Sequence, residues 1–153
     1  MKIRLFLENT RILYDHFSII PLLYGSLGLE VLTNEFLNSD DIDILIPEIY
    51  LKERWDDFKS FLISNGYKLY DVHEHTFVKN DVYISYASLE GLETFVGINI
   101  NEINKYDTNG IQYLLLSLEQ YLKVYTKSIN DGYRINVRKK KDKEKIDFIK
   151  SHI

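Results

Sequence analysis

Apolar and polar positions along the chain change their spacing several times, and each change marks an expected element. Residues 1–17 carry apolar side chains at helical spacing, which predicts an amphipathic helix. Residues 18–24 form a short apolar run, which predicts a buried strand. Because Pro21 cannot donate to a sheet ladder, we expect this strand to lie at an edge of the sheet or to begin near Pro21. A helix over residues 27–36, starting at Ser26, follows it.

The remaining pattern predicts a small sheet with helices around it. Residues 41–46 alternate polar and apolar side chains, as a half-buried strand does. The further expected elements are a helix over 51–65, strands over 67–78 and 82–87, a short helix over 88–96, a helix from Ser117 to Ile129 and a last helix over 140–150. This order predicts a mixed α/β (α+β) fold with a small central mixed β-sheet flanked by helices. We expect a single domain over 1–153, with an α/β core over about 1–100 and a mainly helical C-terminal extension over about 101–153.

Composition narrows the class of protein. Apolar residues make up 45% of the 153 positions, so a core can form without covalent staples. The chain has no cysteine, which excludes disulfides, zinc–thiolate sites and cysteine nucleophiles. No apolar run approaches the roughly 20 residues that a spanning helix needs, and the first residues lack the pattern of a signal peptide. We therefore expect a soluble cytoplasmic protein that does not enter a membrane.

The charge of the chain is negative overall and positive near its end. The formal net charge is −4, yet residues 134–150 hold eight basic and three acidic side chains. An acidic chain argues against nucleic acid as a partner, because neutralised phosphates supply most of that affinity. The basic segment has two interpretations that stay open, a site for one polyphosphate and a solvated helix face. Arg134, on a loop after a helix stop, either reaches a triphosphate or pairs with an acidic side chain.

Two carboxylates stand out on the strand over 41–46. Asp41 and Asp43 project to one side of it and Ile42 to the other, because side chains alternate along a strand. Neighbouring carboxylates repel each other, and a hard divalent cation such as Mg²⁺ compensates for this with one or two carboxylates plus substrate phosphates. The alternative is that both acids lie at a strand end in water, where their repulsion is small.

A second feature lies upstream of these acids. Gly25 and Ser26 follow the apolar strand and precede a helix. Glycine there allows a phosphate to approach the backbone, and the N–H groups at a helix start attract anions. Alone, the pair is an ordinary strand-to-helix turn. Combined with two aspartates on the next strand, it predicts a nucleotide and metal site.

The segments 23–26 and 41–44, Leu-Tyr-Gly-Ser and Asp-Ile-Asp-Ile, together resemble the minimal signature of the nucleotidyltransferase superfamily, the DNA polymerase β-like fold. The resemblance covers residues 18–47, and the segments 116–122 and 141–146 are similar to the helical ending of small bacterial members. It implies that Gly25 and Ser26 hold the phosphates of an NTP donor. It also implies that Asp41 and Asp43 bind Mg²⁺ or Mn²⁺ and that a nucleoside monophosphate moves to a hydroxyl of a small molecule or protein.

The chain departs from this family in two ways. The fourteen residues between Ser26 and Asp41 are somewhat more than the family usually has, and many active members carry a third carboxylate on a later strand, where this chain has Ser85. The candidates for that carboxylate are Asp81 and Glu74, and we favour Glu74 as catalytic because it is expected in mid-strand. If neither reaches the metal, the alternative is a degenerate nucleotidyltransferase-fold protein that binds nucleotides or another protein. A third possibility is a structural protein in which the aspartates end a strand.

His73 and His75 share one face if residues 67–78 form a strand. At that spacing they could ligate a transition metal, or one of them could act as a general base or orient the acceptor. The alternative is that both are polar residues on the solvent side of a hairpin.

Overall fold

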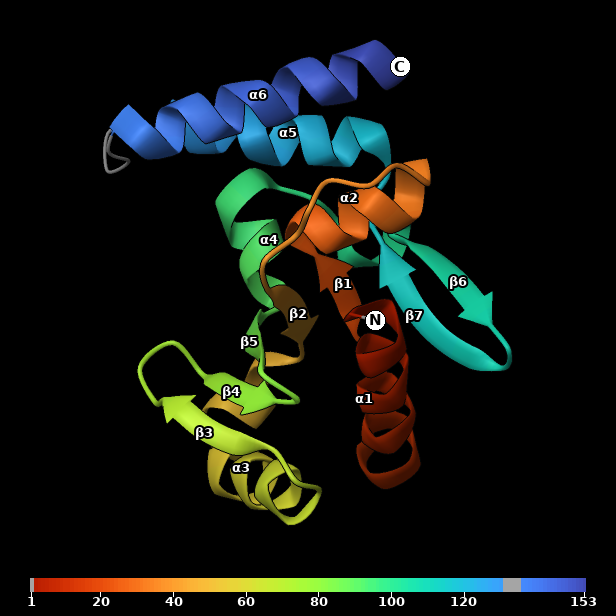
Figure 1. The fold of residues 1–153 in the computed structure, drawn as a ribbon, viewed down its shortest axis with the longest axis vertical. Coiled ribbons are helices and arrows are strands. Elements are labelled where there is room, and N and C mark those ends of the chain that lie inside the picture. The colour runs from red at the N-terminus through yellow and green to blue at the C-terminus, as the bar shows by residue number, and fades with distance from the viewer. Residues whose placement is uncertain (1, 131–135) are drawn as a thin grey trace.

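The computed structural model describes residues 2–130 and 136–153, and these form one seven-stranded mixed sheet with helices on both faces (Figure 1). The strand order is β3-β4-β5-β2-β1-β7-β6. The strands are β1 (Leu22–Tyr24), β2 (Ile42–Ile46), β3 (Lys68–Asp71), β4 (Thr76–Lys79), β5 (Val82–Ser88), β6 (Asn104–Thr108) and β7 (Ile111–Leu115). The helices are α1 (Lys2–Phe17), α2 (Gly25–Thr33), α3 (Trp55–Ser64), α4 (Glu90–Val96), α5 (Leu118–Ile129) and α6 (Asn136–His152), with 3₁₀ turns η1 (Glu48–Leu51) and η2 (Ile100–Glu102). The expected mixed α/β class is confirmed.

Strand β2 shows how the sheet separates two apolar cores. Ile42, Ile44 and Ile46 are fully buried in the core that α1 and α3 cover. Leu45, on the other face of the same strand, belongs to the second core with Leu22 and residues of α2, α4 and α5. Helices α5 and α6 run alongside each other beyond this second core (Figure 1). The face that Leu45 shares is also the face to which Asp43 projects.

Several helix ends follow the local signals in the sequence. Ser117 accepts a hydrogen bond from the Gln120 N–H and the Gln120 side chain accepts one from the Ser117 N–H, which is the expected capping box of α5. The Ser88 hydroxyl accepts from the Gly91 N–H at 3.0 Å, so it satisfies a donor of the first turn of α4.

The structure decides one expectation about the sheet and corrects two. Strand β1 begins directly after Pro21, which was one of the two expected alternatives, and it is central, between β2 and β7. The Pro21 carbonyl accepts from the Leu114 N–H at 2.9 Å. The expected strand over 67–78 is two strands, β3 and β4, with a turn at residues 72–75. The mainly helical extension was predicted to begin at about residue 101, but β6 and β7 follow that position and belong to the sheet, where β7 pairs in parallel with β1.

Along the described stretches, no helix combines the length and the apolarity that crossing a bilayer requires.

Candidate functional site

Gly25 and Ser26 link β1 to α2, and the structure requires a glycine at the first of these positions. Gly25 has a φ of +64°, in the left-handed region that side chains disfavour. A Cβ at this position would also lie 2.7 Å from Oδ2 of Asp43. The backbone at the start of α2 therefore lies directly against the carboxylate of Asp43.

Asp43 occupies the middle of the sheet. It is in register with Tyr24 of β1 on one side and with Ser85 of β5 on the other. Its side chain is half-buried, on the face opposite to Ile42 and Ile44. The carboxylate is thus held at a fixed point between two strands, next to the start of α2.

Asp41 lies just before β2 and is exposed. The partial burial of its carboxyl group raises its pKa above the usual value, the charge of Asp40 raises it further, and Lys2 lowers it. Both raising effects penalise the charged form, so a cation bound beside Asp41 would favour ionisation.

Glu30 of α2 organises the loop that leads to Asp41. Its Oε1 accepts three hydrogen bonds, from the Leu37 N–H at 3.0 Å and from the N–H and the hydroxyl of Ser39 at 3.2 and 2.9 Å. Ser39 is buried. These bonds fix the chain two residues before Asp41, and no sequence motif marks Glu30 as part of the site.

Tyr121 of α5 supports the site from the second core. Its hydroxyl donates to the Gly25 carbonyl at 3.0 Å. A Cβ at Gly28 would meet this hydroxyl and would lie 2.5 Å from the Leu23 carbonyl oxygen, so Gly28 leaves the space that Tyr121 needs. Burial raises the pKa of Tyr121 well above its usual value, and nearby Tyr125, Tyr24 and Asp43 act in the same direction. Tyr121 therefore stays a neutral donor; a sequence signal for its role is the glycine at position 28.

Ser85 stands beside Asp43 where a third carboxylate was sought. Its hydroxyl is 2.7 Å from that of Thr76 in β4, and the two residues are register partners. Thr76, Ser85, Asp43 and Tyr24 are thus neighbours across four strands on one face of the sheet. The two positions next to Asp43 on the β5 side carry hydroxyl groups.

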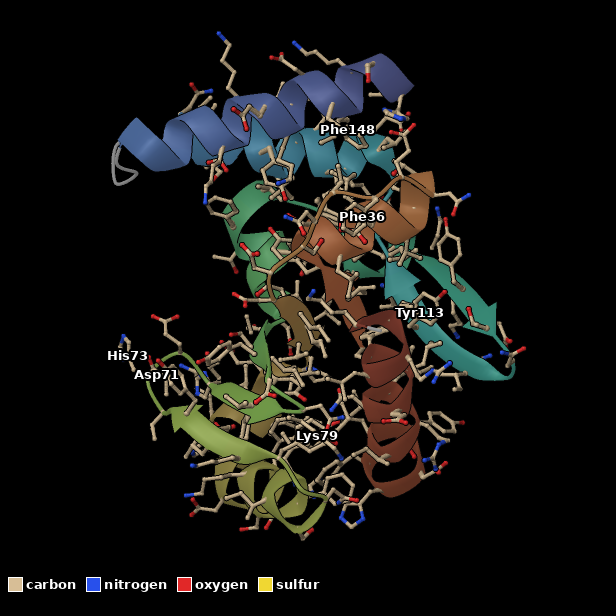
Figure 2. The ribbon with its side chains drawn as sticks, in the orientation of Figure 1. Phe36, Asp71, His73, Lys79, Tyr113 and Phe148 are labelled. Atoms are coloured by element: carbon tan, nitrogen blue, oxygen red, sulfur yellow. The ribbon has the colours of Figure 1, made fainter. Side chains whose placement is uncertain are left out.

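Glu74 does not lie in mid-strand as expected. It is exposed in the turn at 72–75, and its N–H donates to Oδ1 of Asp71 at 3.2 Å. Asp71 and His73 project from the outer end of the β3–β4 hairpin (Figure 2). Within residues 2–130 and 136–153, no three histidine, aspartate or glutamate side chains are grouped closely enough to hold a metal ion, so Glu74 does not join Asp41 and Asp43 in such a group.

The two histidines near Glu74 do not share a strand face. His73 is exposed in the turn, and His75, with a φ of +52°, packs edge-on against Trp55 at 4.7 Å between ring centroids. Burial lowers the pKa of His75, the charges of His73 and Lys52 lower it further, and Glu74 raises it. The expected common face is wrong because the turn rotates the chain between them. Arg134 lies outside the described residues.

The donor set at Asp41 and Asp43 fits a hard divalent cation. Both residues offer carboxylate oxygens, the ligands that Mg²⁺ and Mn²⁺ prefer, and Mg²⁺ needs few protein ligands when substrate phosphates complete its shell. Because Gly25 has no Cβ, the Asp43 carboxylate can lie close to the start of α2, where backbone N–H groups attract phosphate. These two aspartates would hold the cation together with the phosphates of a nucleotide.

The fold and this arrangement define the class of the protein, which has a nucleotidyltransferase-like fold. Its structure is similar to the solution structure of the antibiotic-resistance factor ANT(2'')-Ia, with a TM-score of 0.52 over 99% of this chain and 91% of that chain. The sequences are 12% identical, so this likeness concerns the fold. No protein-family model matches the chain.

The relationship in sequence is closer to a second protein. The chain belongs to the same family as the uncharacterized protein YnaI of Bacillus subtilis (strain 168). The two are 40% identical over 144 residues, which span 94% of this chain and 92% of YnaI.

Proposed function

We propose that the protein is a metal-dependent nucleotidyltransferase that moves a nucleoside monophosphate from an NTP to a hydroxyl of a small molecule or protein. The observation that carries this proposal is the contact between Gly25 and Asp43, where a Cβ would lie 2.7 Å from Oδ2. The contact joins a helix start to the carboxylate of Asp43 within a nucleotidyltransferase-like fold. The structural neighbour is an antibiotic-resistance factor whose conformation is regulated by its substrate, which supports a small-molecule acceptor.

The reaction assigns a role to each part of the site. Gly25 and Ser26 bind and orient the phosphates of the NTP through backbone N–H groups and the serine hydroxyl, and Arg134 adds a positive charge. Asp41 and Asp43 would hold Mg²⁺ or Mn²⁺, which would supply positive charge at the transferring phosphate and the leaving pyrophosphate. The acceptor oxygen forms a bond to the α-phosphorus while the bond from the α-phosphorus to the pyrophosphate oxygen breaks. The hydroxyl proton passes to water, and Glu74 is the third carboxylate predicted from the sequence.

The test compares the wild-type protein with Asp43→Asn, using an α-labelled NTP, MgCl₂ and a panel of hydroxylated acceptors that includes an aminoglycoside. We expect the variant to transfer label at a rate lower by a factor on the order of 100 or more, because a catalytic charge is lost while the side-chain size is kept. Asp15→Asn is the matched control, since Asp15 is exposed on α1. Equal transfer by Asp43→Asn and the wild type would contradict the proposal, and Glu74→Gln tests the predicted third carboxylate in the same assay.

A second candidate is a nucleotide-binding module that does not turn its ligand over. The observation that favours it is Ser85, a hydroxyl residue in register with Asp43 at the position where a third carboxylate was sought. Calorimetry separates the two candidates. Magnesium-dependent NTP binding without pyrophosphate release in the presence of any acceptor of the panel would support the binding module.

A further inference from the structure

Strand β5 has one buried face and one open face. Ile84 and Tyr86 are buried in the core that α1 and α3 cover. The alternate positions, Tyr83 and Ala87, are exposed, and Ser85 between them is half-buried. The face of the sheet that carries Asp43 is therefore open over β5, unlike the part of the same face near β1 and β2, where Leu22 and Leu45 pack into the second core.

Two tyrosines stand on this open face. The Tyr83 ring is 4.8 Å from the ring of Tyr70 in β3, at an interplanar angle of 71°. Tyr70 is 64% exposed and Tyr83 is 40% exposed, so both rings present part of their area to solvent. Val78 of β4 is the register partner of Tyr83 and lies in the strand between them. The pair forms an aromatic surface, here called the Tyr70–Tyr83 platform, with apolar ring area left open to solvent.

The platform is continuous with the candidate site. Tyr83 precedes Ser85 by two residues and shares its face, and Ser85 is the register partner of Asp43. Across the sheet, the platform on β3 and β5 and the hydroxyl pair of Thr76 and Ser85 on β4 and β5 lie on one side of the Asp43 carboxylate on β2. Gly25–Ser26, after β1, lie on its other side.

This order matches the geometry of the proposed reaction, on which the inference rests. Phosphoryl transfer places the attacking and leaving oxygens roughly in line on opposite sides of the phosphorus. If the leaving pyrophosphate lies at Gly25–Ser26 and the α-phosphorus lies at Asp43, the attacking hydroxyl comes from the β5 side. We propose that the Tyr70–Tyr83 platform binds the acceptor, and that the acceptor is a small molecule whose hydroxyl is attached near a planar ring.

The dimensions and the chemistry agree with this occupant. Adjacent strands are about 4.8 Å apart, so β3 is about 14 Å from β2, a span that a ring with a short hydroxylated arm covers. Planar rings stack on aromatic side chains without needing a particular hydrogen-bond pattern. The attacking oxygen, the α-phosphorus and the leaving oxygen lie roughly on one line, and the donor's nucleoside is attached to the phosphorus to the side of this line. The platform lies on the line, on the side of the attacking oxygen, so we assign it to the acceptor.

The experiment uses uridine and ribose as matched acceptors, since both carry ribose hydroxyls and uridine adds a planar ring. With α-labelled ATP and MgCl₂, we expect the wild type to use uridine with a KM about tenfold or more below that for ribose. Tyr83→Leu and Tyr70→Leu should raise the uridine KM about tenfold and leave the ATP KM unchanged. Tyr83→Phe should behave as the wild type, as should Tyr14→Leu, which alters an exposed tyrosine of α1.

Two results in this assay would overturn the inference: equal use of uridine and ribose, or a rise in the ATP KM in place of the uridine KM, which would assign the platform to the donor base.

A binding experiment separates this inference from the proposed function. If the wild type transfers to no acceptor, uridine binding is measured by calorimetry with the donor site filled by α,β-methylene-ATP and MgCl₂. Binding that Tyr83→Leu weakens and Tyr83→Phe keeps would support the platform without catalysis, and no uridine binding by the wild type would reject it.

Discussion

The hydroxyl of Tyr121 donates a hydrogen bond of 3.0 Å to the backbone carbonyl of Gly25, joining residues 96 positions apart in the chain. The bond connects α5 to the link between β1 and α2. Because Gly25 also lies against the Asp43 carboxylate, a helix of the second core helps to set the position of the candidate phosphate site.

The first prediction concerns this bond. Tyr121→Phe keeps the ring and removes the donor, which leaves the Gly25 carbonyl without this partner in a buried region. We expect the free energy of unfolding to fall by about 1–2 kcal/mol and the affinity for Mg²⁺–ATP to fall with it, because the Gly25 backbone loses its support. Urea unfolding measures the first change and calorimetry the second.

Tyr86→Phe is the matched control for Tyr121→Phe. The Tyr86 hydroxyl is also buried and accepts a hydrogen bond of 2.7 Å from Nδ2 of Asn9, but it lies in the core covered by α1 and α3. This variant should lose stability and keep its ATP affinity. An equal loss of affinity in both variants would show that Tyr121 acts through stability alone.

The second prediction concerns Gly25. Gly25→Ala combines a strained backbone, which costs about 1–2 kcal/mol, with a methyl group placed against Asp43 Oδ2. We expect Mg²⁺–ATP binding to be lost, because the carboxylate and the start of α2 cannot both keep their positions. Calorimetry and thermal unfolding measure the two effects.

Gly110→Ala separates backbone strain from the contact. Gly110 has a φ of +84°, and a Cβ built there meets nothing within 4 Å. The variant should lose about 1–2 kcal/mol through strain and bind ATP as the wild type does. ATP binding by Gly25→Ala at wild-type affinity would contradict the assignment of the phosphate site.

The third prediction is a pH dependence of stability from His152 of α6. Its Nδ1 lies 2.8 Å from the Phe148 carbonyl and its Nε2 lies 3.2 Å from Oε1 of Glu35. The bond to the Phe148 carbonyl, followed by Glu35, raises the pKa of His152 above its usual value of 6.5. Because protonated His152 is favoured in the folded state, it adds to the free energy of unfolding, and this contribution is complete below pH 6.5, the pKa in the unfolded chain. The contribution is lost as the pH rises through the higher pKa of the folded state.

Urea unfolding of the wild type and His152→Gln at about pH 5.5 and about pH 9 tests this sign. The stability difference between the two proteins should be larger at the lower pH, and added salt should reduce it because the pair is partly exposed. Glu35→Gln should weaken the same pH dependence. A difference that is equal at both pH values would show that the His152 charge does not contribute.

The features that local sequence could predict are those that depend on neighbouring residues. The capping box of Ser117 and Gln120 spans one helical turn, and the strand that carries Asp43 has its own alternation. The turn at 72–75 was missed because its residues, Val-His-Glu-His, include no glycine, proline or asparagine. As a result, Glu74 and the two histidines were expected on a strand that does not exist.

Features that depend on distant packing were not readable in the same way. The central place of β1 arises from its parallel pairing with β7, about ninety residues later, and Tyr121 has no local signal that directs it to Gly25. The alternation at 82–87 predicted β5, but the register that puts Ser85 beside Asp43 comes from the sheet. Single residues of the site were therefore identifiable, and their mutual arrangement was not.

The fourth prediction tests the missing carboxylate at Ser85. Ser85→Asp places an acid in register with Asp43 on the same face of the sheet. Without divalent cations, the new charge should repel Asp43 and lower the melting temperature, since neighbouring like charges across a sheet are destabilising. Added MgCl₂ should restore more stability to this variant than to the wild type, because a third carboxylate strengthens a site for a hard cation.

Ser85→Asn is the control, since it adds similar bulk without charge and also disturbs the hydrogen bond to Thr76. Thermal unfolding in EDTA and in MgCl₂ should show a cation-dependent difference for the aspartate variant and none for the asparagine variant. If Ser85→Asp also gains nucleotidyl transfer that the wild type lacks, Ser85 is the position at which activity was lost. If the wild type already transfers and the variant gains nothing, two carboxylates suffice in this site. A variant with no response to MgCl₂ would place Ser85 outside reach of any cation held by Asp43.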